Sequence, residues 1–462
     1  MDSSSRTEAA LEALPLEKVV EAWKILRPAL WPTHLLRCPA LEEKSGYRIW
    51  LKPENLQRTG SYKIRGAYYK LHQLVQQRGV KRVVAASAGN HAQGVAYAAR
   101  EMGIDCEIVM PERAPLPKRR ATMRYGARLI LKGSSFDEAL RYALDYAPAE
   151  GREFISPYDD PEVITGQGTV AWEVLEEMKD YPPDAVLVPV GGGGLLAGVA
   201  TVMDKCLPRT KLIAVQSVCA PAYVRSWHAY RHQKAGAAAN EAAGDGTNAD
   251  ASYPLDVPTQ ETIADGVRVR QPGQLCWKLT KDFVAGAISL EDSQVYQGIL
   301  FLAEQSKLVA EGAGALGVSA LLDAAALQQI RDAGVEPGAR VVVLVTGGNI
   351  DTLTLQRVVE RSTAMNGRER ALSLRITDEP GQMDYILNFL RQKRATVVDM
   401  RRSWKKGPLI SGMDDIEILI ETDDELHGEE VLQELAQEAK AHNFQLLLDD
   451  QEKKPEGKPP IR

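Results

Sequence analysis

The sequence predicts an α/β protein with a main part built on open parallel sheets, followed by a small ferredoxin-like sandwich. Up to about residue 360, short apolar runs alternate with glycine turns and alanine-rich helical stretches. Strands that alternate with helices in this way indicate parallel sheets covered by helices on both faces. After residue 365 the order becomes strand, helix, strand, strand, helix, strand, which is typical of a ferredoxin-like fold.

The main part is predicted over residues 1–364, with a small subdomain over roughly residues 82–160. Residues 233–255 interrupt the alternation of strands and helices because they are rich in Ala, Gly, Asn and Asp and carry no periodic apolar face. We expect a mobile surface insertion there. The strand signals are RVVAAS (82–87), CEIVMP (106–111), AVLVPV (185–190) and ARVVVLV (339–345).

The second domain is predicted over residues 370–450. It opens with the strand-like run RALSLRITD, an EPG turn and the helical run MDYILNFLRQKR. Two further strand-like runs, an amphipathic helix and a last short strand complete the βαββαβ order. Residues 451–462, rich in Lys and Pro, are expected to form a disordered tail.

The composition excludes several classes of function. The chain of 462 residues has a net charge of −6 and no broad basic stripe, so we expect no nucleic-acid partner. No apolar run is long enough to span a bilayer and no signal pattern opens the chain, so we expect a cytoplasmic protein without a membrane partner. The five cysteines and seven histidines are scattered, which argues against a disulfide framework or a metal site.

The first motif that carries chemistry is ENLQRTGSYKIRGA, residues 54–67, in which Lys63 follows a Gly-Ser turn. A desolvated lysine amine has a lowered pKa and can attack an aldehyde. The alternative is a surface lysine beside a turn. On this motif alone that alternative prevails, because lysines next to turns are common.

The second motif is SAGNHAQG, residues 87–94, which follows a strand signal and opens a helix. Free backbone N–H groups and the positive helix end suit an anion such as a carboxylate. Asn90 can add a side-chain hydrogen bond. An ordinary Ser/Asn helix cap is an equally good interpretation of this motif alone.

The third motif is the glycine run Gly191, Gly192, Gly193 and Gly194 between a strand signal and a helical stretch. Without side chains, the backbone can wrap closely around a phosphate at the helix N-terminus. The run is neither a dinucleotide fingerprint nor a P-loop. A simple flexible turn is the alternative.

The fourth motif, TGGN at residues 346–349, places Thr346 at the carboxyl end of a predicted strand. Ligands gather at those ends in open parallel sheets. Three of the four motifs follow a strand signal, so we expect them to converge at one mouth of the sheet.

Together the motifs resemble those of the fold type II pyridoxal-phosphate (PLP) enzymes, which share the fold of the tryptophan synthase β chain. Within that group the chain is most similar to the threonine deaminase and serine racemase branch, over roughly residues 15–360. The resemblance implies PLP as the cofactor, a small amino acid as the substrate, and two open parallel-sheet subdomains.

The resemblance also implies roles for single residues. Lys63 corresponds to the lysine that holds PLP as a Schiff base. Asn90 corresponds to the asparagine that hydrogen-bonds the PLP 3′-oxygen, and Thr346 to the residue beside the pyridine nitrogen. The glycine run corresponds to the phosphate cradle. The residues implied in receiving the substrate carboxylate are Ser87, Ala88, Gly89, Asn90 and His91.

Two further residues match positions near the cofactor in this branch. Tyr62 stands where the family has an aromatic residue beside the ring, and Glu311 of EGAGA matches a glutamate near the cofactor. The chain departs from the racemases at Ala88, where they carry a serine that acts as a second acid or base. Gln216 and Ala222 replace acidic residues of the racemase divalent-metal site, so no metal is expected.

The C-terminal part resembles an ACT domain, a regulatory module that binds amino acids, because its turn matches D-x-P-G. We therefore expect Asp378, Pro380 and Gly381 to mark a regulatory site with a branched-chain amino acid as its effector. The resemblance implies a homodimer or homotetramer. A plain ferredoxin-like structural domain is the alternative.

The implied activity is that of a threonine ammonia-lyase, which converts L-threonine, and also L-serine, to a 2-oxo acid and ammonia. A serine racemase or hydroxyaspartate dehydratase on the same fold is one alternative. A non-catalytic amino-acid sensor is another, although the intact Lys63 weighs against it.

Overall fold

The computed structural model describes residues 14–243, 253–365, 369–377, 379–402, 413–423 and 425–447. The chain divides between Leu355 and Gln356 into two compact units. The division falls within helix α15 (Thr352–Met365), so that most of this helix belongs to the second unit.

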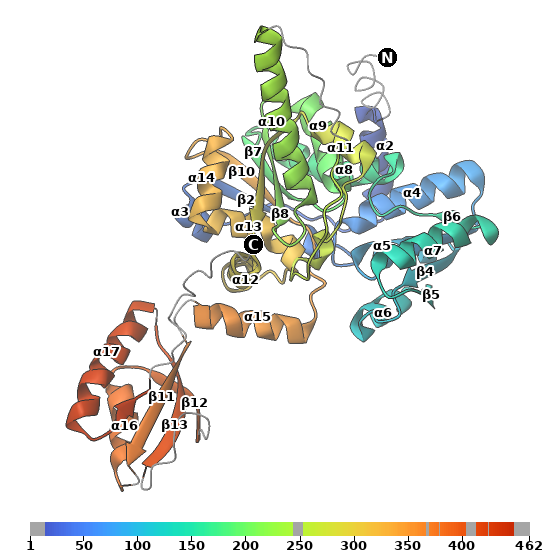
Figure 1. Cartoon of the computed structure of the whole chain (residues 1–462). Helices are drawn as coiled ribbons and strands as arrows, with labels where there is room; N and C mark the ends of the chain where they lie inside the picture. Colours follow the sequence, from blue (N-terminus) through green and yellow to red (C-terminus); the bar gives the residue numbers. More distant parts are fainter. Residues whose placement is uncertain are drawn as a thin grey trace, which may run out of the picture. The chain divides into compact units, whose positions relative to one another are not determined.

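The first unit contains two sheets flanked by helices (Figure 1). Its strands are β1 (Leu36–Arg37), β2 (Arg48–Pro53), β3 (Arg82–Ala86), β4 (Asp105–Met110), β5 (Arg128–Leu131), β6 (Glu153–Phe154), β7 (Ala185–Pro189), β8 (Lys211–Ser217), β9 (Val284–Leu290) and β10 (Arg340–Val345). Its helices are α2 (Leu16–Leu26), α3 (Pro39–Ser45), α4 (Lys63–Arg78), α5 (Asn90–Glu101), α6 (Leu116–Met123), α7 (Phe136–Ala149), α8 (Pro161–Glu177), α9 (Gly194–Cys206), α10 (Ala222–Ala243), α11 (Gln274–Thr280), α12 (Asp292–Phe301), α13 (Gly312–Leu322) and α14 (Ala324–Asp332).

Both sheets are open and parallel, as the alternation of strands and helices predicts. The large sheet has the order β1-β2-β10-β7-β8-β9, and only the short β1 runs antiparallel to its neighbour. The small sheet has the order β5-β4-β3-β6 and is parallel throughout. The strand signals in the sequence correspond to β3, β4, β7 and β10, so the prediction of an α/β fold with two open parallel sheets is confirmed.

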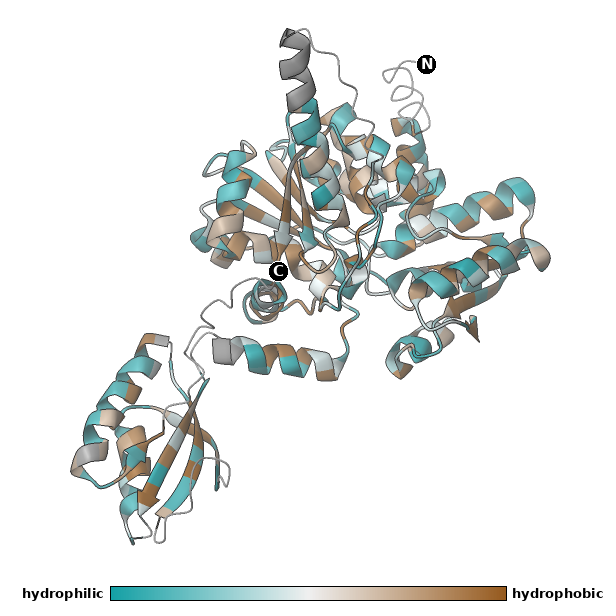
Figure 2. Cartoon of the chain, viewed as in Figure 1, coloured by the Kyte–Doolittle hydropathy of each residue, from teal (hydrophilic) through white to brown (hydrophobic). Residues whose placement is uncertain are grey.

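The core of the first unit lies along the strands of the large sheet. Every residue of β7 is buried, and so is all of β10 except its first residue. Figure 2 shows the hydrophobic residues concentrated on these strands and hydrophilic ones on the outer helices. Within the described residues no single helix is long and apolar enough to cross a membrane, and only the bent pair α13–α14 passes by length and composition.

Only the two ends of the predicted surface insertion at residues 233–255 lie within the described part of the chain. Residues 233–243 continue helix α10, because alanine has a strong helix propensity even without an apolar face. Tyr253 stacks on Trp277 with ring centroids 5.9 Å apart, and the Leu255 amide donates to Ser226 Oγ. Residues 244–252 lie outside the described part of the chain.

The second unit is a ferredoxin-like sandwich. Its antiparallel sheet has the order β12-β13-β11-β14, and side chains of both helices pack into the core on that sheet. This order matches the predicted βαββαβ pattern. The elements are β11 (Glu369–Thr377), α16 (Gln382–Gln392), β12 (Thr396–Arg402), β13 (Met413–Glu421), α17 (Glu425–Ala441) and β14 (Gln445–Leu446).

The turn predicted to mark a regulatory site is only partly described. Asp378 lies outside the described residues, while Pro380 and Gly381 precede helix α16. Gly381 has φ +97°, a left-handed conformation that glycine adopts without strain. The tail predicted over residues 451–462 also lies outside the described residues.

Candidate active site

The residues predicted for catalysis, cofactor binding and substrate binding line one cavity of the first unit. This cavity has a volume of about 240 Å³. It lies where β3, β7 and β10 end, because the second, third and fourth motifs directly follow these strands. The predicted residues that line it are Tyr62, Lys63, Ser87, Ala88, Gly89, Asn90, His91, Gly191, Gly192, Gly193, Gly194, Glu311 and Thr346.

Lys63 is the first residue of helix α4, and its side chain reaches the cavity wall. Its Nζ donates a hydrogen bond of 2.9 Å to the Pro157 carbonyl and lies 5.4 Å from the centre of the Tyr62 ring. Burial lowers the pKa of this amine to about 8, since an apolar environment disfavours the charged form. About a tenth of Lys63 is therefore neutral and nucleophilic at pH 7, far more than of an ordinary lysine.

The loop from Ser87 to His91 joins β3 to helix α5, whose first residue is Asn90. The Gly89 amide donates to Ser87 Oγ at 3.1 Å, which shapes the loop. The backbone amides at the start of a helix such as α5 suit an anion like a carboxylate.

His91 is buried beside this loop, with Nε2 3.0 Å from the Ile155 carbonyl. A carbonyl only accepts hydrogen bonds, so Nε2 carries the hydrogen. Burial, together with the nearby charge of Lys63, lowers the pKa of His91 to about 3. The ring is therefore neutral near neutral pH, and its Nδ1 is an acceptor.

A chain of amides and a carboxyl crosses one wall of the cavity. Asn349 donates from Nδ2 to Asn90 Oδ1 at 2.8 Å, and Asn90 donates from Nδ2 to Glu311 Oε1 at 2.6 Å. Burial, and to a smaller extent Asp265, raises the pKa of Glu311 to about 7. A Cβ on Gly347 would lie 2.4 Å from Glu311 Oε1, so a side chain there would displace the Glu311 carboxyl from its present position.

The glycine run forms the entrance to helix α9. Gly193 is its N-cap residue with φ +98°, and a Cβ on Gly192 would lie 2.2 Å from the ring of Tyr158. Backbone alone can approach so closely. The run therefore presents the amides at the start of α9 to the cavity, the arrangement that suits a phosphate.

Thr346 follows the last residue of β10 and is buried, with its hydroxyl 3.4 Å from the Ala313 carbonyl. This contact comes from α13, the helix that follows Glu311. The hydroxyl is thus the polar group that this sheet end presents to the cavity.

The structure adds cavity residues that the motifs did not single out. Asn349 was within the TGGN motif, but its partner Asn90 lies 259 positions away in the sequence. Tyr158 belongs to an SPYDDP run after β6, a polar turn at a strand end that could have drawn attention. Lys118 of α6 and Asp265 form an ion pair at the cavity edge, which no local pattern predicts.

Gln216, where the racemases are expected to carry an acidic residue, holds the start of helix α10. Its Oε1 accepts the amides of Tyr223 (3.1 Å) and Val224 (3.2 Å) at the start of α10. In the described residues no group of three or more His, Cys, Asp or Glu side chains is arranged to hold a metal ion.

The residues of the cavity fit PLP. A lysine amine with a lowered pKa can join the aldehyde. The glycine run packs its backbone closely against neighbouring residues such as Tyr158, and its amides at the start of α9 suit the phosphate. Asn90 and Thr346 add a side-chain amide and a hydroxyl on the same cavity wall. The donor set therefore matches an aldehyde, a phosphate and a polar ring.

Comparison with known proteins identifies the class. Residues 26–347 match the model of the pyridoxal-phosphate dependent enzyme family, which is more than half of the chain. The chain belongs to this family. Its first unit has the fold of the type II members: maize serine racemase superposes with a TM-score of 0.64 at 28% identity, over 76% of this chain and 99% of that one.

Several relatives are named as threonine-deaminating enzymes. L-threonine ammonia-lyase of Thermotoga maritima is 38% identical over 420 residues, covering 90% of this chain and 96% of that protein. The catabolic L-threonine dehydratase of Escherichia coli strain K12 is 36% identical over 74% of this chain and 95% of that protein. The processed form of threonine deaminase isoform 2 from Solanum lycopersicum superposes with a TM-score of 0.63 at 30% identity, over 79% of this chain and 90% of that one.

Proposed function

We propose that the protein is a PLP-dependent threonine ammonia-lyase, which releases ammonia and 2-oxobutanoate from L-threonine, and pyruvate from L-serine. The observation that carries the proposal is the single cavity lined by all four motifs, with Lys63 at its wall and Ala88 in its loop. The names of the relatives from Thermotoga maritima and Escherichia coli support the same activity.

The cofactor would be held by the residues that the cavity brings together. Lys63 would bind its aldehyde, the glycine run its phosphate, and Asn90 and Thr346 the ring oxygen and ring nitrogen. Tyr62 and Glu311 would flank the ring. When bound, PLP supplies an electron sink for the negative charge that develops at the substrate α-carbon.

Lys63 moves the proton in this proposal. Lys63 would be a free amine again once the amino group of the substrate has displaced it from the aldehyde carbon, and it would then accept the α-proton of the amino acid, for which a pKa of about 8 is well suited. The loop from Ser87 to His91 would hold the substrate carboxylate on its backbone amides and so direct the α-hydrogen toward the lysine. The β-hydroxyl would leave as water with the proton that Lys63 carries, and hydrolysis would give the 2-oxo acid and ammonia.

Two side chains favour elimination over other reactions of the same substrate. Ala88 has no group that could return a proton to the opposite side of the α-carbon, which disfavours racemisation. The hydroxyl of Thr346 is neutral and does not favour a protonated ring nitrogen as a carboxylate would, which disfavours transamination.

The direct test mixes purified protein, PLP and L-threonine and measures 2-oxobutanoate. Formation of the keto acid supports the proposal, and the lack of a keto acid from both L-threonine and L-serine would sink it. D-serine that forms faster than pyruvate would favour the racemase alternative. A protein that gives no absorption band with PLP would favour the sensor alternative.

The second unit is proposed as an ACT regulatory module. A cavity of about 430 Å³ in this unit is lined by Pro380 and Gly381 and by charged residues of both signs, among them Asp384 and Arg401. A carboxylate and a guanidinium in one cavity suit the ammonium and the carboxylate of an amino acid. We propose a branched-chain amino acid as the effector. Isoleucine or valine should then shift the activity, and Arg401→Gln should remove most of that shift; an unchanged response would contradict the assignment.

A homodimer or homotetramer and a cytoplasmic location complete the proposal. Strand β12 lies at the edge of its sheet, with Val398 50% and Met400 46% exposed, so a second copy could extend the sheet there. Light scattering on the purified protein tests the assembly, and a monomer at micromolar concentration would contradict it.

A further inference from the structure

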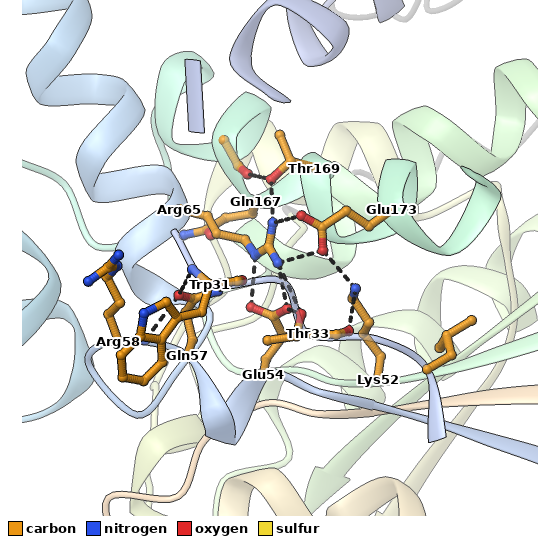
Figure 3. A network of polar contacts seen from close by, with 12 residues as sticks. Trp31, Thr33, Lys52, Glu54, Gln57, Arg58, Arg65, Gln167, Thr169 and Glu173 are labelled. Carbon is orange, nitrogen blue, oxygen red and sulfur yellow. Dashed lines mark hydrogen bonds and ion pairs between the residues drawn. The ribbon is translucent and has the colours of Figure 1, made fainter. Parts of the chain in front are cut away.

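A buried polar network includes the side chains of Lys52, Glu54 and Glu173 (Figure 3). At its centre is Arg65, which is only 1% exposed and lies two residues after Lys63 in helix α4. Residues two apart in a helix point to nearly opposite sides. Lys63 therefore faces the cavity while Arg65 faces away from it, from the same helical turn.

All three nitrogen atoms of the Arg65 guanidinium group donate hydrogen bonds. It binds Glu54 in a bidentate manner, through Nε at 2.8 Å and Nη2 at 2.7 Å. It binds Glu173 in the same way, through Nη1 and Nη2, both at 2.8 Å. The hydroxyls of Thr169 and Thr33 accept two further hydrogen bonds at 3.2 Å. Paired contacts of this kind fix the orientation of the guanidinium plane.

Lys52 is a further member of the network and contacts Glu173. Its side chain is fully buried, and Nζ lies 2.7 Å from Glu173 Oε2 and 2.7 Å from the Thr33 carbonyl. Burial alone would raise the pKa of Glu173, but Arg65 and Lys52 outweigh burial and lower it to about 2. The network therefore sets the side chains of Arg65 and Lys52 against those of Glu54 and Glu173.

The network joins the elements that carry the site. Lys52 lies on β2, opposite Leu344 of β10, the strand that ends directly before Thr346. Glu173 lies on α8, whose backbone touches α4 so closely that a Cβ on Gly166 would lie 2.7 Å from Gly66 Cα.

Helix α8 also packs against the helix of the glycine run. A Cβ on Gly198 of α9 would lie 2.5 Å from the Gly168 amide nitrogen. Close-packed helices without side chains between them keep a fixed separation. Helix α8 therefore sets the spacing between the start of α4 and the start of α9.

We propose that Arg65 is the positioning residue for Lys63: by clamping the first turn of α4 between Glu54 and Glu173, it holds the lysine amine at the distance from the glycine run that PLP requires. This inference rests on the proposed role of Lys63 in holding PLP. Arg65 acts through Lys63 and does not line the cavity itself. A lysine in its place would keep the charge and lose both bidentate contacts.

The small subdomain offers a matched control for a purely structural role. Arg152 is 8% exposed and also lies between two carboxylates, with Nη2 2.8 Å from Asp105 Oδ2 and Nε 2.5 Å from Glu107 Oε2. It does not line the cavity. Arg152→Lys makes the same chemical change as Arg65→Lys at another buried arginine between two carboxylates, one of which, Asp105, is 49% exposed. Only Arg65 lies close to Lys63 in helix α4.

The experiment measures the dissociation constant of PLP and the fraction of Lys63 that PLP labels after borohydride reduction and peptide mapping. Arg65→Lys should weaken PLP binding about tenfold or more, since small displacements of a reacting group have large effects, and should lower the labelling of Lys63 accordingly. Arg152→Lys should lower the melting temperature without changing either quantity more than about twofold. If Arg65→Lys does not fold, Glu173→Gln, which keeps the size of the side chain, replaces it in both measurements.

The proposal is overturned if Arg65→Lys, or Glu173→Gln in its place, binds PLP and labels Lys63 like the wild type. A wild-type protein that PLP does not label at Lys63 overturns it as well. Neither measurement uses an amino-acid substrate. Wild-type protein that is labelled at Lys63 but releases no 2-oxo acid would contradict the proposed function alone.

Discussion

Two lysines in neighbouring elements of the first unit have opposite surroundings. Lys63 at the start of α4 lines the cavity and donates to a single backbone carbonyl, that of Pro157, at 2.9 Å, and burial lowers its pKa to about 8. Lys52 on β2 is fully buried, and its amine lies 2.7 Å from a carboxylate oxygen of Glu173. The two lysines differ above all in the partner of the amine, which is a carbonyl for Lys63 and a carboxylate for Lys52.

The comparison shows how one residue type becomes a nucleophile or a structural cation. A buried ammonium without a nearby carboxylate loses hydration and gains little in return, so it gives up its proton readily. A buried ammonium against a carboxylate keeps its charge. Lys63 therefore lies in the cavity as a reactive amine, and Lys52 lies behind it as part of the network around Arg65.

The largest expected effect is that of removing the reactive amine. Lys63→Ala should lower turnover of L-threonine by at least about 10²–10⁴-fold, the usual contribution of a positioned base, and should abolish the absorption band of lysine-bound PLP. Steady-state kinetics and absorption spectra measure both. A variant with turnover within tenfold of the wild type would overturn the role of Lys63.

The second lysine should affect stability instead. Lys52→Met leaves the Glu173 carboxylate with one cation fewer, and breaking a buried pair of this kind costs about 3–5 kcal/mol. Denaturant unfolding measures the loss, and peptide mapping should still find PLP on Lys63. Lys234→Met is the control, because Lys234 and its partner Asp282 are 58% and 42% exposed and such pairs contribute at most about 1 kcal/mol. If Lys52→Met unfolds at the same denaturant concentration as this control, its pairing has no energetic consequence.

The pKa of Lys63 predicts a pH dependence for the capture of PLP by the apoprotein. Only the neutral amine attacks the aldehyde, and its fraction increases with pH until the pKa is passed. The rate should therefore rise about tenfold per pH unit below pH 8 and level off above it. Nα-acetyl-lysine, which keeps its side-chain amine, serves as the reference. The rate at which it reacts with PLP should still rise above pH 9. A rate for the protein that follows this reference would show that burial does not tune Lys63.

The sequence predicts the elements that surround the two lysines better than it predicts their partners. The strands β3, β7 and β10 are signalled by apolar runs followed by glycine or polar turns, and these local patterns placed the motifs at sheet ends. The four motifs also carried the resemblance to PLP enzymes. Local periodicity was enough for these features because each depends on neighbours in the sequence.

The partners depend on tertiary packing, which no local pattern contains. Glu173 lies 108 positions from Arg65, and Asn349 lies 259 positions from Asn90. The sequence therefore gives no indication that Lys52 is paired and Lys63 is not. The helix at residues 233–243 is a different case, because the helix propensity of alanine supports it even though the segment has no apolar face.

The smallest expected effect on ammonia release comes from adding a second proton carrier to the cavity. If Lys63 alone carries the α-proton, Ala88→Ser should let a hydroxyl exchange protons from another direction, as the serine of the racemases is expected to do. D-serine formation from L-serine should then increase by about 10²-fold, a modest contribution for a positioned acid or base, while ammonia release should change less than about tenfold. Chiral chromatography measures the first quantity and a coupled ammonia assay the second.

Ala88→Gly is the matched control, since it opens the same space without a hydroxyl. If both variants form D-serine at the same rate, the added space and not the added hydroxyl causes racemisation. That result would contradict the prediction that a second proton carrier is what the cavity lacks.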